Sequence, residues 1–240
     1  MSSKILVLPG DGIGVEVADQ AIRVIDKLNE LGLDATYEKE LVGGASYDAN
    51  GEPLTSKVLE KAKQSDAILL GAVGGSKWDD VERSKRPEAG LLGLRKKLEL
   101  FANLRPALVF EALASASTLK DEVVSNLDIM IVRELTGGVY FGQPRGIEDT
   151  AEGKKAVDTQ VYYDYEIDRI ARVAFDLARK RNNKVTSVEK ANVMETGVLW
   201  RQVVKDTHQD FSDVQLENML ADNCAMQPVS YTHLRAHETY

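Results

Sequence analysis

The chain has 240 residues, of which 43% are hydrophobic and 28% are charged, so its composition is that of a folded protein and excludes global disorder. Lysine and arginine number 30 and aspartate and glutamate number 38, and the net charge of −8 argues against a partner that is nucleic acid or an anionic membrane. The single cysteine, Cys224, excludes an internal disulfide and any multi-cysteine zinc site, and it fits a reducing compartment.

The first part of the chain alternates between predicted strands and helices. Short apolar runs predict strands at 4–8 and 67–73, and 35–40 is taken as a further strand between them. Apolar residues at helical spacing predict a helix from Gly14 that stops at Gly32, and a second at 54–64. This β-α-β-α-β order predicts a parallel sheet flanked by helices. The first apolar run is too short for a signal peptide, and no stretch approaches the roughly 20 apolar residues of a membrane span, so we expect a cytoplasmic protein.

The rest of the chain continues the α/β pattern. Strands are predicted at 102–110, 128–135 and 184–189, with an extended segment at 139–141. Helices are predicted at 88–99, 166–180 and 197–208. We expect a domain change near residue 100, which gives a first domain over 1–100 and a second over 101–228. Residues 229–240 form a tail that holds two of the three histidines and has no third metal ligand nearby.

A glycine cluster, Gly10-Asp11-Gly12-Ile13-Gly14, follows the first predicted strand and precedes the first predicted helix. A dinucleotide fingerprint has glycines at positions one, three and six, whereas here they fall at one, three and five, and Val15 takes the sixth. The classical Rossmann fingerprint is therefore absent. Two interpretations remain open: a backbone that a ligand can approach closely, or a tight turn from strand to helix.

Three arginines, Arg95, Arg105 and Arg133, lie in or beside apolar stretches, where an unpaired guanidinium is costly. Arg133 closes the run 129–132, at the carboxyl end of a predicted strand, which is where open α/β sheets place ligands. Guanidinium groups bind carboxylates through two parallel hydrogen bonds. Together the three predict a site for a di- or tricarboxylate, and the alternative is that they form internal salt bridges.

Three further residues have side chains suited to catalysis. Tyr140 can donate a proton, although a lone tyrosine in a strand more often lies in the core or at its rim. Lys190 ends a predicted strand and can act as a base, or can simply be a solvated surface lysine. Asp222 can supply an oxygen ligand to Mg²⁺, or can cap a helix or turn.

Several longer stretches carry a resemblance to a known family. They include GDGIG (10–14), AVGGSKWD (72–79), PEAGLLGLRKKLELFANLRPA (87–107), DIMIVRELTGGVYFGQPRG (128–146), KVTSVEKANVMETGVLWR (184–201) and LADNCAMQ (220–227). With these stretches the chain resembles the β-decarboxylating dehydrogenases that act on isopropylmalate and isocitrate. The resemblance implies a two-domain α/β fold that is not a classical Rossmann fold. It also implies NAD-dependent oxidation of 3-isopropylmalate at the C2 hydroxyl, with Mg²⁺ or Mn²⁺, followed by loss of CO₂ to give 2-oxoisocaproate in leucine biosynthesis.

The resemblance also assigns roles by matching position. Arg95, Arg105 and Arg133 correspond to carboxylate-binding residues, Lys190 to the base, Tyr140 to the acid, and Asp222 to a metal ligand. Around the substrate it implies Glu88, Leu91, Leu92 and Val193, and around the cofactor Ile13, Gly74, Glu88 and Asn192. In the family Lys190 and Asp222 complete the site of the neighbouring subunit, so a homodimer is implied.

Leu91 and Leu92 decide the expected substrate, because isocitrate-specific relatives present polar groups there for a third carboxylate. Apolar side chains suit an isopropyl group and would desolvate a charge, so isopropylmalate is favoured over isocitrate, homoisocitrate or tartrate. The resemblance stops at Gln227, where the family continues with two more metal-binding aspartates and an adenine-binding loop. We therefore expect a fold that is incomplete at its C-terminus, a non-native tail at 229–240, and no activity from these 240 residues alone. The alternative function is a non-catalytic fragment that binds polyanions weakly.

Overall fold

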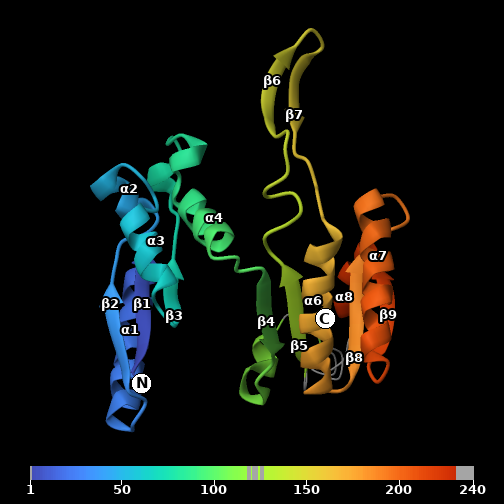
Figure 1. The fold of residues 1–240 in the computed structure, drawn as a ribbon, viewed down its shortest axis with the longest axis horizontal. Helices are drawn as coiled ribbons and strands as arrows, with labels where there is room; N and C mark the ends of the chain where they lie inside the picture. Colours follow the sequence, from blue (N-terminus) through green and yellow to red (C-terminus); the bar gives the residue numbers. More distant parts are fainter. Residues whose placement is uncertain (1, 118–119, 121–123, 125–126, 231–240) are drawn as a thin grey trace. The chain divides into compact units, whose positions relative to one another are not determined.

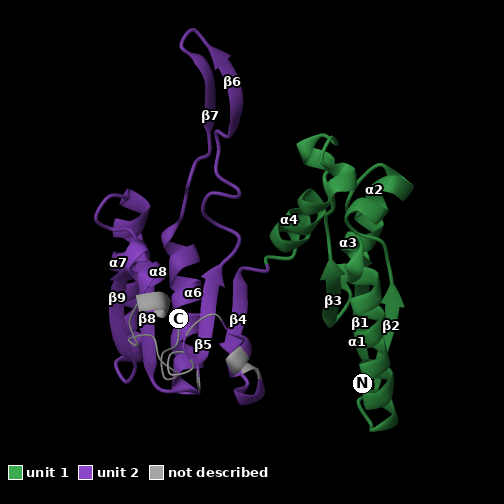
Figure 2. Cartoon of the chain, turned by 180° about the vertical axis from the view of Figure 1, so that it is seen from behind, with its two compact units in different colours: residues 1–99 green, residues 100–240 purple. Residues whose placement is uncertain are grey.

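A computed structural model describes residues 2–117, 120, 124 and 127–230. The chain forms two compact units, residues 1–99 and residues 100–240, coloured green and purple in Figure 2. Within the described residues, no helix has the length and apolar character needed to cross a membrane.

Unit 1 is built on a three-stranded parallel sheet in the order β2-β1-β3 (Figure 1). Its strands are β1 (Ser3–Gly10), β2 (Ala35–Lys39) and β3 (Ala67–Ala72), and its helices are α1 (Ile13–Glu30), α2 (Gly44–Asn50), α3 (Ser56–Lys63) and α4 (Pro87–Lys97). The two faces of β1 alternate as a central strand requires: Val7 packs with Ala18 and Ile22 of α1, whereas Leu6 and Leu8 pack into the cluster that α3 and α4 cover. The predicted parallel sheet is confirmed.

The strands of unit 2 form three separate pairs. β4 (Ala102–Leu108) pairs with β5 (Asp128–Glu134) antiparallel, and β8 (Lys184–Glu189) pairs with β9 (Gln215–Leu220) parallel. β6 (Gly146–Thr150) and β7 (Gly153–Val157) form a hairpin whose residues are exposed except for the half-buried Val157.

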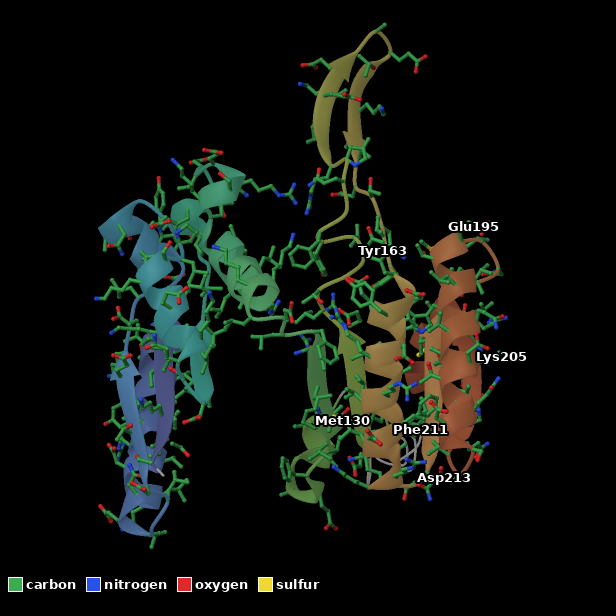
Figure 3. The ribbon with its side chains drawn as sticks, viewed as in Figure 1. Met130, Tyr163, Glu195, Lys205, Phe211 and Asp213 are labelled. Carbon is green, nitrogen blue, oxygen red and sulfur yellow. The ribbon has the colours of Figure 1, made fainter. Side chains whose placement is uncertain are left out.

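Two helices, α6 (Asp164–Arg179) and α7 (Glu195–His208), supply the core of unit 2. Ile167 and Phe175 of α6 are fully buried, and the Phe175 ring stacks on Phe211 with 5.1 Å between ring centroids. Phe211 lies beyond the end of α7, near Asp213, which binds Arg179 of α6 (Figure 3). The last described element is α8 (Ala221–Ser230), which follows β9 directly.

The structure corrects one predicted element and adds five helices and strands that were not predicted. Residues 139–141 form a turn instead of continuing an extended segment. The reason lies just before them: Gly138 has a φ of +78° and bonds through its backbone to Val161, and this redirects the chain. Helices α2 and α8, the β6–β7 hairpin and strand β9 were not predicted. Of the tail expected at 229–240, residues 231–240 lie outside the described residues.

Candidate active site

In unit 1 the buried carboxylate of Asp11 joins three loops at the carboxyl ends of the parallel strands. Its oxygens accept backbone hydrogen bonds from Gly44 at 2.8 Å, Ala45 at 2.7 Å and Gly74 at 2.8 Å. Asp11 is only 4% exposed, so these three donors compensate for the loss of water around its charge. The glycine cluster therefore belongs to an ordered set of loops at the carboxyl ends of the strands, where parallel α/β sheets bind ligands.

Gly74 and Glu88 lie together at this edge. Gly74 has a φ of +107°, and a Cβ placed on it would lie 2.6 Å from Glu88 Oε1. A glycine is therefore required where the Glu88 carboxylate meets the loop that follows β3. Ile13, at the start of α1, is 61% exposed beside the same edge of the sheet. These three residues, which the resemblance connects with the cofactor, are thus found at one end of one sheet.

Helix α4 presents four predicted site residues at helical spacing. Leu91 and Leu92 each lie three or four residues from both Glu88 and Arg95, which places the four residues along one side of the helix. Leu91 and Leu92 are half-buried, while Leu94 is 2% exposed and belongs to the core. Leu94 therefore faces the core, whereas Leu91 and Leu92 lie on the helix surface between the Glu88 carboxylate and the Arg95 guanidinium.

In unit 2 the β4–β5 ladder brings Arg105 and Arg133 onto the same face. Asn103 lies opposite Arg133 and Arg105 lies opposite Ile131, and directly opposed residues share a face in an antiparallel pair. Arg105 Nε donates to Asn103 Oδ1 at 2.8 Å, so Asn103 separates the two guanidinium groups. Both arginines are exposed, which leaves their charges able to meet an anion.

Tyr140 reaches back from its turn to Arg133. The guanidinium donates to the phenol oxygen at 3.0 Å, and its carbon lies 5.4 Å from the centre of the Tyr140 ring. The hydroxyl oxygen accepts this bond, which leaves the O–H proton available to another partner. Tyr140 is 43% exposed and lies in a turn, so it is a rim side chain and is not part of a strand or of the core.

Lys190 and Asp222 follow the ends of the paired parallel strands β8 and β9. Because Glu189 lies opposite Leu220, the two residues leave the ladder at the same edge. Lys190 Nζ donates to Asp222 Oδ1 at 2.6 Å. Lys190 also borders a cavity of about 270 Å³, whose wall includes Gln160, Tyr162 and Trp200. The structure thus joins the predicted base to the predicted metal ligand.

The Lys190 ammonium lowers the pKa of the Asp222 carboxyl, chiefly through the side-chain hydrogen bond, with smaller help from backbone amides at the start of α8. We expect Lys190→Met to raise the pKa of Asp222 toward its ordinary range, because the cation that favours the carboxylate is removed. Carbon-detected NMR titration of the Asp222 carboxyl in both proteins measures this pKa. An unchanged Asp222 titration in Lys190→Met would show that the pair does not persist in solution.

The described residues do not complete a metal site. Asp222 offers a carboxylate, but among the described side chains no group of three or more histidine, cysteine or acidic residues could hold an ion. Asn192 and Val193 lie in the turn between β8 and α7, where the Val193 and Met194 amides donate to the Lys190 carbonyl. Val193 is 72% exposed, and this suits the contact with a partner subunit that the resemblance implies.

Two buried carboxylates next to predicted site residues were missed by the sequence analysis. Glu134 follows Arg133 and is bound by Arg169 of α6, and Glu189 precedes Lys190 and is bound by Arg201 of α7. Their side chains are 1% and 2% exposed. The available signal was an acidic residue at or next to the end of a predicted strand, because a charge buried there needs a partner.

Comparison with known proteins identifies relatives over nearly the whole chain. The profile of the family described as isocitrate/isopropylmalate dehydrogenase matches residues 4–233. The 3-isopropylmalate dehydrogenase of Caulobacter vibrioides is 63% identical over 227 residues, which cover 94% of this chain and 64% of the relative. That of Chromohalobacter salexigens is 57% identical over 230 residues, with 95% and 64% covered. The chain therefore spans about 64% of the length of these two relatives.

Solved structures show the same fold. The isocitrate dehydrogenase of Methylococcus capsulatus superposes with a TM-score of 0.77 and 28% identity, over 99% of this chain and 65% of that one. A β-decarboxylating dehydrogenase of Thermococcus kodakarensis gives a TM-score of 0.73 at 28% identity, over 99% and 63%. The predicted fold class is thereby confirmed.

Proposed function

The chain belongs to the isocitrate/isopropylmalate dehydrogenase family, and we propose that it carries substrate-binding and acid–base residues of an NAD-dependent 3-isopropylmalate dehydrogenase. The reaction is oxidation of the C2 hydroxyl of 3-isopropylmalate and loss of CO₂ to give 2-oxoisocaproate, a step of leucine biosynthesis. The observation that carries this proposal is the arrangement on α4, where Leu91 and Leu92 lie beside Arg95. Apolar side chains next to a carboxylate-binding cation complement a malate that carries an alkyl group.

Charge complementarity supports the substrate class. Arg105 and Arg133 share a face of the β4–β5 ladder, and each offers donors that match a carboxylate. Exposed guanidinium groups at fixed positions on a ladder can hold a malate unit in one orientation, and such positioning lowers the barrier of the following chemistry. Leu91 and Leu92 disfavour a third carboxylate, which would lose its hydration against them.

The proton transfers are assigned to two of this chain's own side chains. Lys190, once its ammonium has lost a proton, takes the proton of the C2 hydroxyl as the hydroxyl is oxidised to a ketone. As the C3 carboxylate leaves as CO₂, Lys190 returns this proton to the C2 oxygen to give the enol. Tyr140 then gives a proton to C3, and the enol hydroxyl gives its proton back to Lys190. Arg133 holds the Tyr140 oxygen at 3.0 Å and so directs the phenol proton away from itself. NAD, when bound, accepts the hydride from C2.

The cofactor assignment covers NAD and a divalent ion. Ile13, Gly74 and Glu88 at the strand ends of unit 1, with Asn192 in unit 2, are the residues proposed to contact NAD. For Mg²⁺ or Mn²⁺, Asp222 supplies a single carboxylate among the described residues, so no step is derived through the metal. A cytoplasmic homodimer, in which Lys190, Val193 and Asp222 serve the partner's site, is part of the same proposal.

The test of this function uses two proteins. The first is the 240-residue chain; the second, called here the completed chain, joins residues 1–227 to the part of the Caulobacter relative that this chain does not span. NADH formation from 3-isopropylmalate, NAD⁺ and Mn²⁺ is followed by absorbance. We expect turnover by the completed chain and none by the 240 residues alone. A completed chain that is folded and binds NAD but does not oxidise 3-isopropylmalate contradicts the proposal.

A second candidate is a polyanion-binding fragment without turnover; its guanidinium groups Arg105 and Arg133 are exposed, and no group of three or more possible metal ligands lies among the described residues. Calorimetric titration of the 240-residue chain with 3-isopropylmalate distinguishes the two. Binding that is lost in Arg133→Met, without any NADH formation by the completed chain, favours this candidate over the enzyme.

The specificity of the completed chain depends on α4. We expect the double substitution Leu91→Ser and Leu92→Asn to lower kcat/KM for 3-isopropylmalate relative to malate by about 10- to 100-fold, because apolar contacts discriminate by about 1–3 kcal/mol. Steady-state kinetics with both substrates measures this ratio. The matched control is Leu100→Ser, an exposed leucine of unit 2, which we expect to leave the ratio unchanged. An unchanged ratio in the α4 variant would refute the assignment of this pocket.

A further inference from the structure

Glu134 is a buried carboxylate at the last position of β5, directly after Arg133. Its side chain is 1% exposed, yet it receives five hydrogen bonds. The Thr136 amide, the Thr136 hydroxyl and the Gly137 amide donate to Oε1, at 2.7, 2.8 and 3.2 Å. Glu134 thus closes the turn that follows the strand, because donors two and three residues ahead in the chain bind back to its carboxylate.

Arg169 of α6 anchors this carboxylate from the other side. Its Nε lies 3.2 Å from Oε2 and its Nη2 lies 3.2 Å from Oε1, the two-pronged arrangement that fixes a carboxylate plane. Arg169 Nη2 also donates to the Thr136 hydroxyl at 2.6 Å, and its guanidinium carbon lies 4.5 Å from the centre of the Phe101 ring. These contacts tie the turn to helix α6, and the three residues Glu134, Arg169 and Thr136 are called the clamp.

Two residues of the clamp, Glu134 and Thr136, lie between Arg133 and Tyr140 along the chain. From Arg133 the chain passes through Glu134 and Thr136 to Gly138, whose amide bonds to the Val161 carbonyl at 2.7 Å, and then reaches Tyr140. Neighbouring side chains lie close to the backbone of this turn. A Cβ on Gly137 would lie 2.8 Å from Glu166 Oε2, and a Cβ on Gly138 would lie 2.5 Å from the Tyr162 hydroxyl. The direction in which the chain leaves β5 thus decides where the Tyr140 hydroxyl lies.

We infer that Glu134 is a positioning residue: held by Arg169 and Thr136, it sets the turn that brings the Tyr140 hydroxyl to the Arg133 guanidinium. It acts through these two residues and touches no reacting atom. The inference rests on the proposed function only for the roles given to Arg133 and Tyr140. The geometry itself can be measured without substrate.

The experiment uses the 240-residue chain with 3-fluorotyrosine in place of its eight tyrosines. Fluorine NMR is recorded at a pH where the phenols stay protonated, and Tyr140→Phe assigns the Tyr140 signal. Arg133→Met gives the signal position when the pair is absent. We expect Glu134→Gln to move the Tyr140 signal by more than its linewidth toward that position, because an amide cannot accept from both prongs of Arg169 and from the turn at once.

Glu189→Gln is the matched control, because Glu189 is also a buried carboxylate at a strand end and is also clamped by an arginine of a helix. We expect it to leave the Tyr140 signal in place. If both variants shift the signal equally, the effect is general loosening of the fold and the inference is overturned. A folded Glu134→Gln protein with an unmoved Tyr140 signal overturns it as well.

Arg169→Lys decides the matter if Glu134→Gln does not fold, which circular dichroism shows. Lysine keeps the cation beside Glu134 but loses the two-pronged contact. We expect the Tyr140 signal to shift in the same direction as in Arg133→Met, and an unmoved signal in folded Arg169→Lys overturns the inference. None of these NMR measurements requires turnover. A failed activity assay would therefore not overturn the positioning role of Glu134, and a failed NMR test would not overturn the proposed reaction.

Discussion

Lys190→Ala is expected to lower kcat of the completed chain by about 10²- to 10⁴-fold, the usual contribution of a positioned acid or base, with little change in KM. The physical reason is that Lys190 Nζ is the group held at the strand edge by Asp222 at 2.6 Å, and alanine leaves no side chain to take the C2 hydroxyl proton. Steady-state oxidation of 3-isopropylmalate, followed through NADH absorbance, separates kcat from KM.

Lys205→Ala is the control for this substitution. Lys205 is an exposed lysine of α7 in the same unit (Figure 3), so its removal changes the net charge by the same amount. We expect its kcat to stay within a factor of about two of the unsubstituted protein, as exposed positions away from the site rarely matter. A Lys190→Ala protein that loses only substrate affinity would refute the role of Lys190 as the base.

Tyr140→Phe is expected to lower kcat by a similar factor of about 10²–10⁴, because it deletes the phenol proton assigned to C3 of the enol. The aromatic ring remains, so the packing of the Arg133 guanidinium at 5.4 Å from the ring centre is preserved while the 3.0 Å hydrogen bond is lost. Analysis of the products adds a second measurement, since slowed protonation still permits oxidation and loss of CO₂.

Tyr163→Phe provides the matched loss of a hydroxyl. Tyr163 is 59% exposed at the start of α6 and stacks on Tyr165, with 5.8 Å between ring centroids (Figure 3). We expect kcat of this variant to be close to that of the unsubstituted protein. If Tyr140→Phe and Tyr163→Phe both keep full kcat, the acid is another group and the assignment of Tyr140 is wrong.

Strands β1 and β3 of unit 1 could be predicted because each contains a short apolar run next to strong turn signals. Leu6, Val7 and Leu8 are all fully buried, so the run has no polar member to obscure it. In unit 2 the amphipathic helix α6 was equally clear, and its apolar positions are the ones that form the core. The spacing of apolar residues was sufficient to predict a helix or strand wherever that element packs against one large core.

Long-range pairing could not be predicted in the same way. The contact of Lys190 with Asp222 depends on the parallel ladder of β8 and β9, and the β9 sequence QLENML shows no strand periodicity. The turn at Tyr140 depends on a backbone bond between Gly138 and Val161, which lie far apart in the sequence. The buried carboxylates Glu134 and Glu189 depend on arginines from helices that follow them, so their partners became visible only in three dimensions.

The β6–β7 hairpin has a consequence for handling the protein. Two strands without a core are marginal in water, and here the cross-strand ion pairs Glu148–Lys155 and Asp149–Lys154 join side chains that are more than half exposed. Added salt screens such pairs, so the hairpin opens more often as ionic strength rises. We therefore expect trypsin to cleave the isolated chain after Lys154 and Lys155 faster at high salt than at low salt, which limited proteolysis measures. A substrate or subunit that covers this hairpin would slow cleavage by trypsin after Lys154 and Lys155.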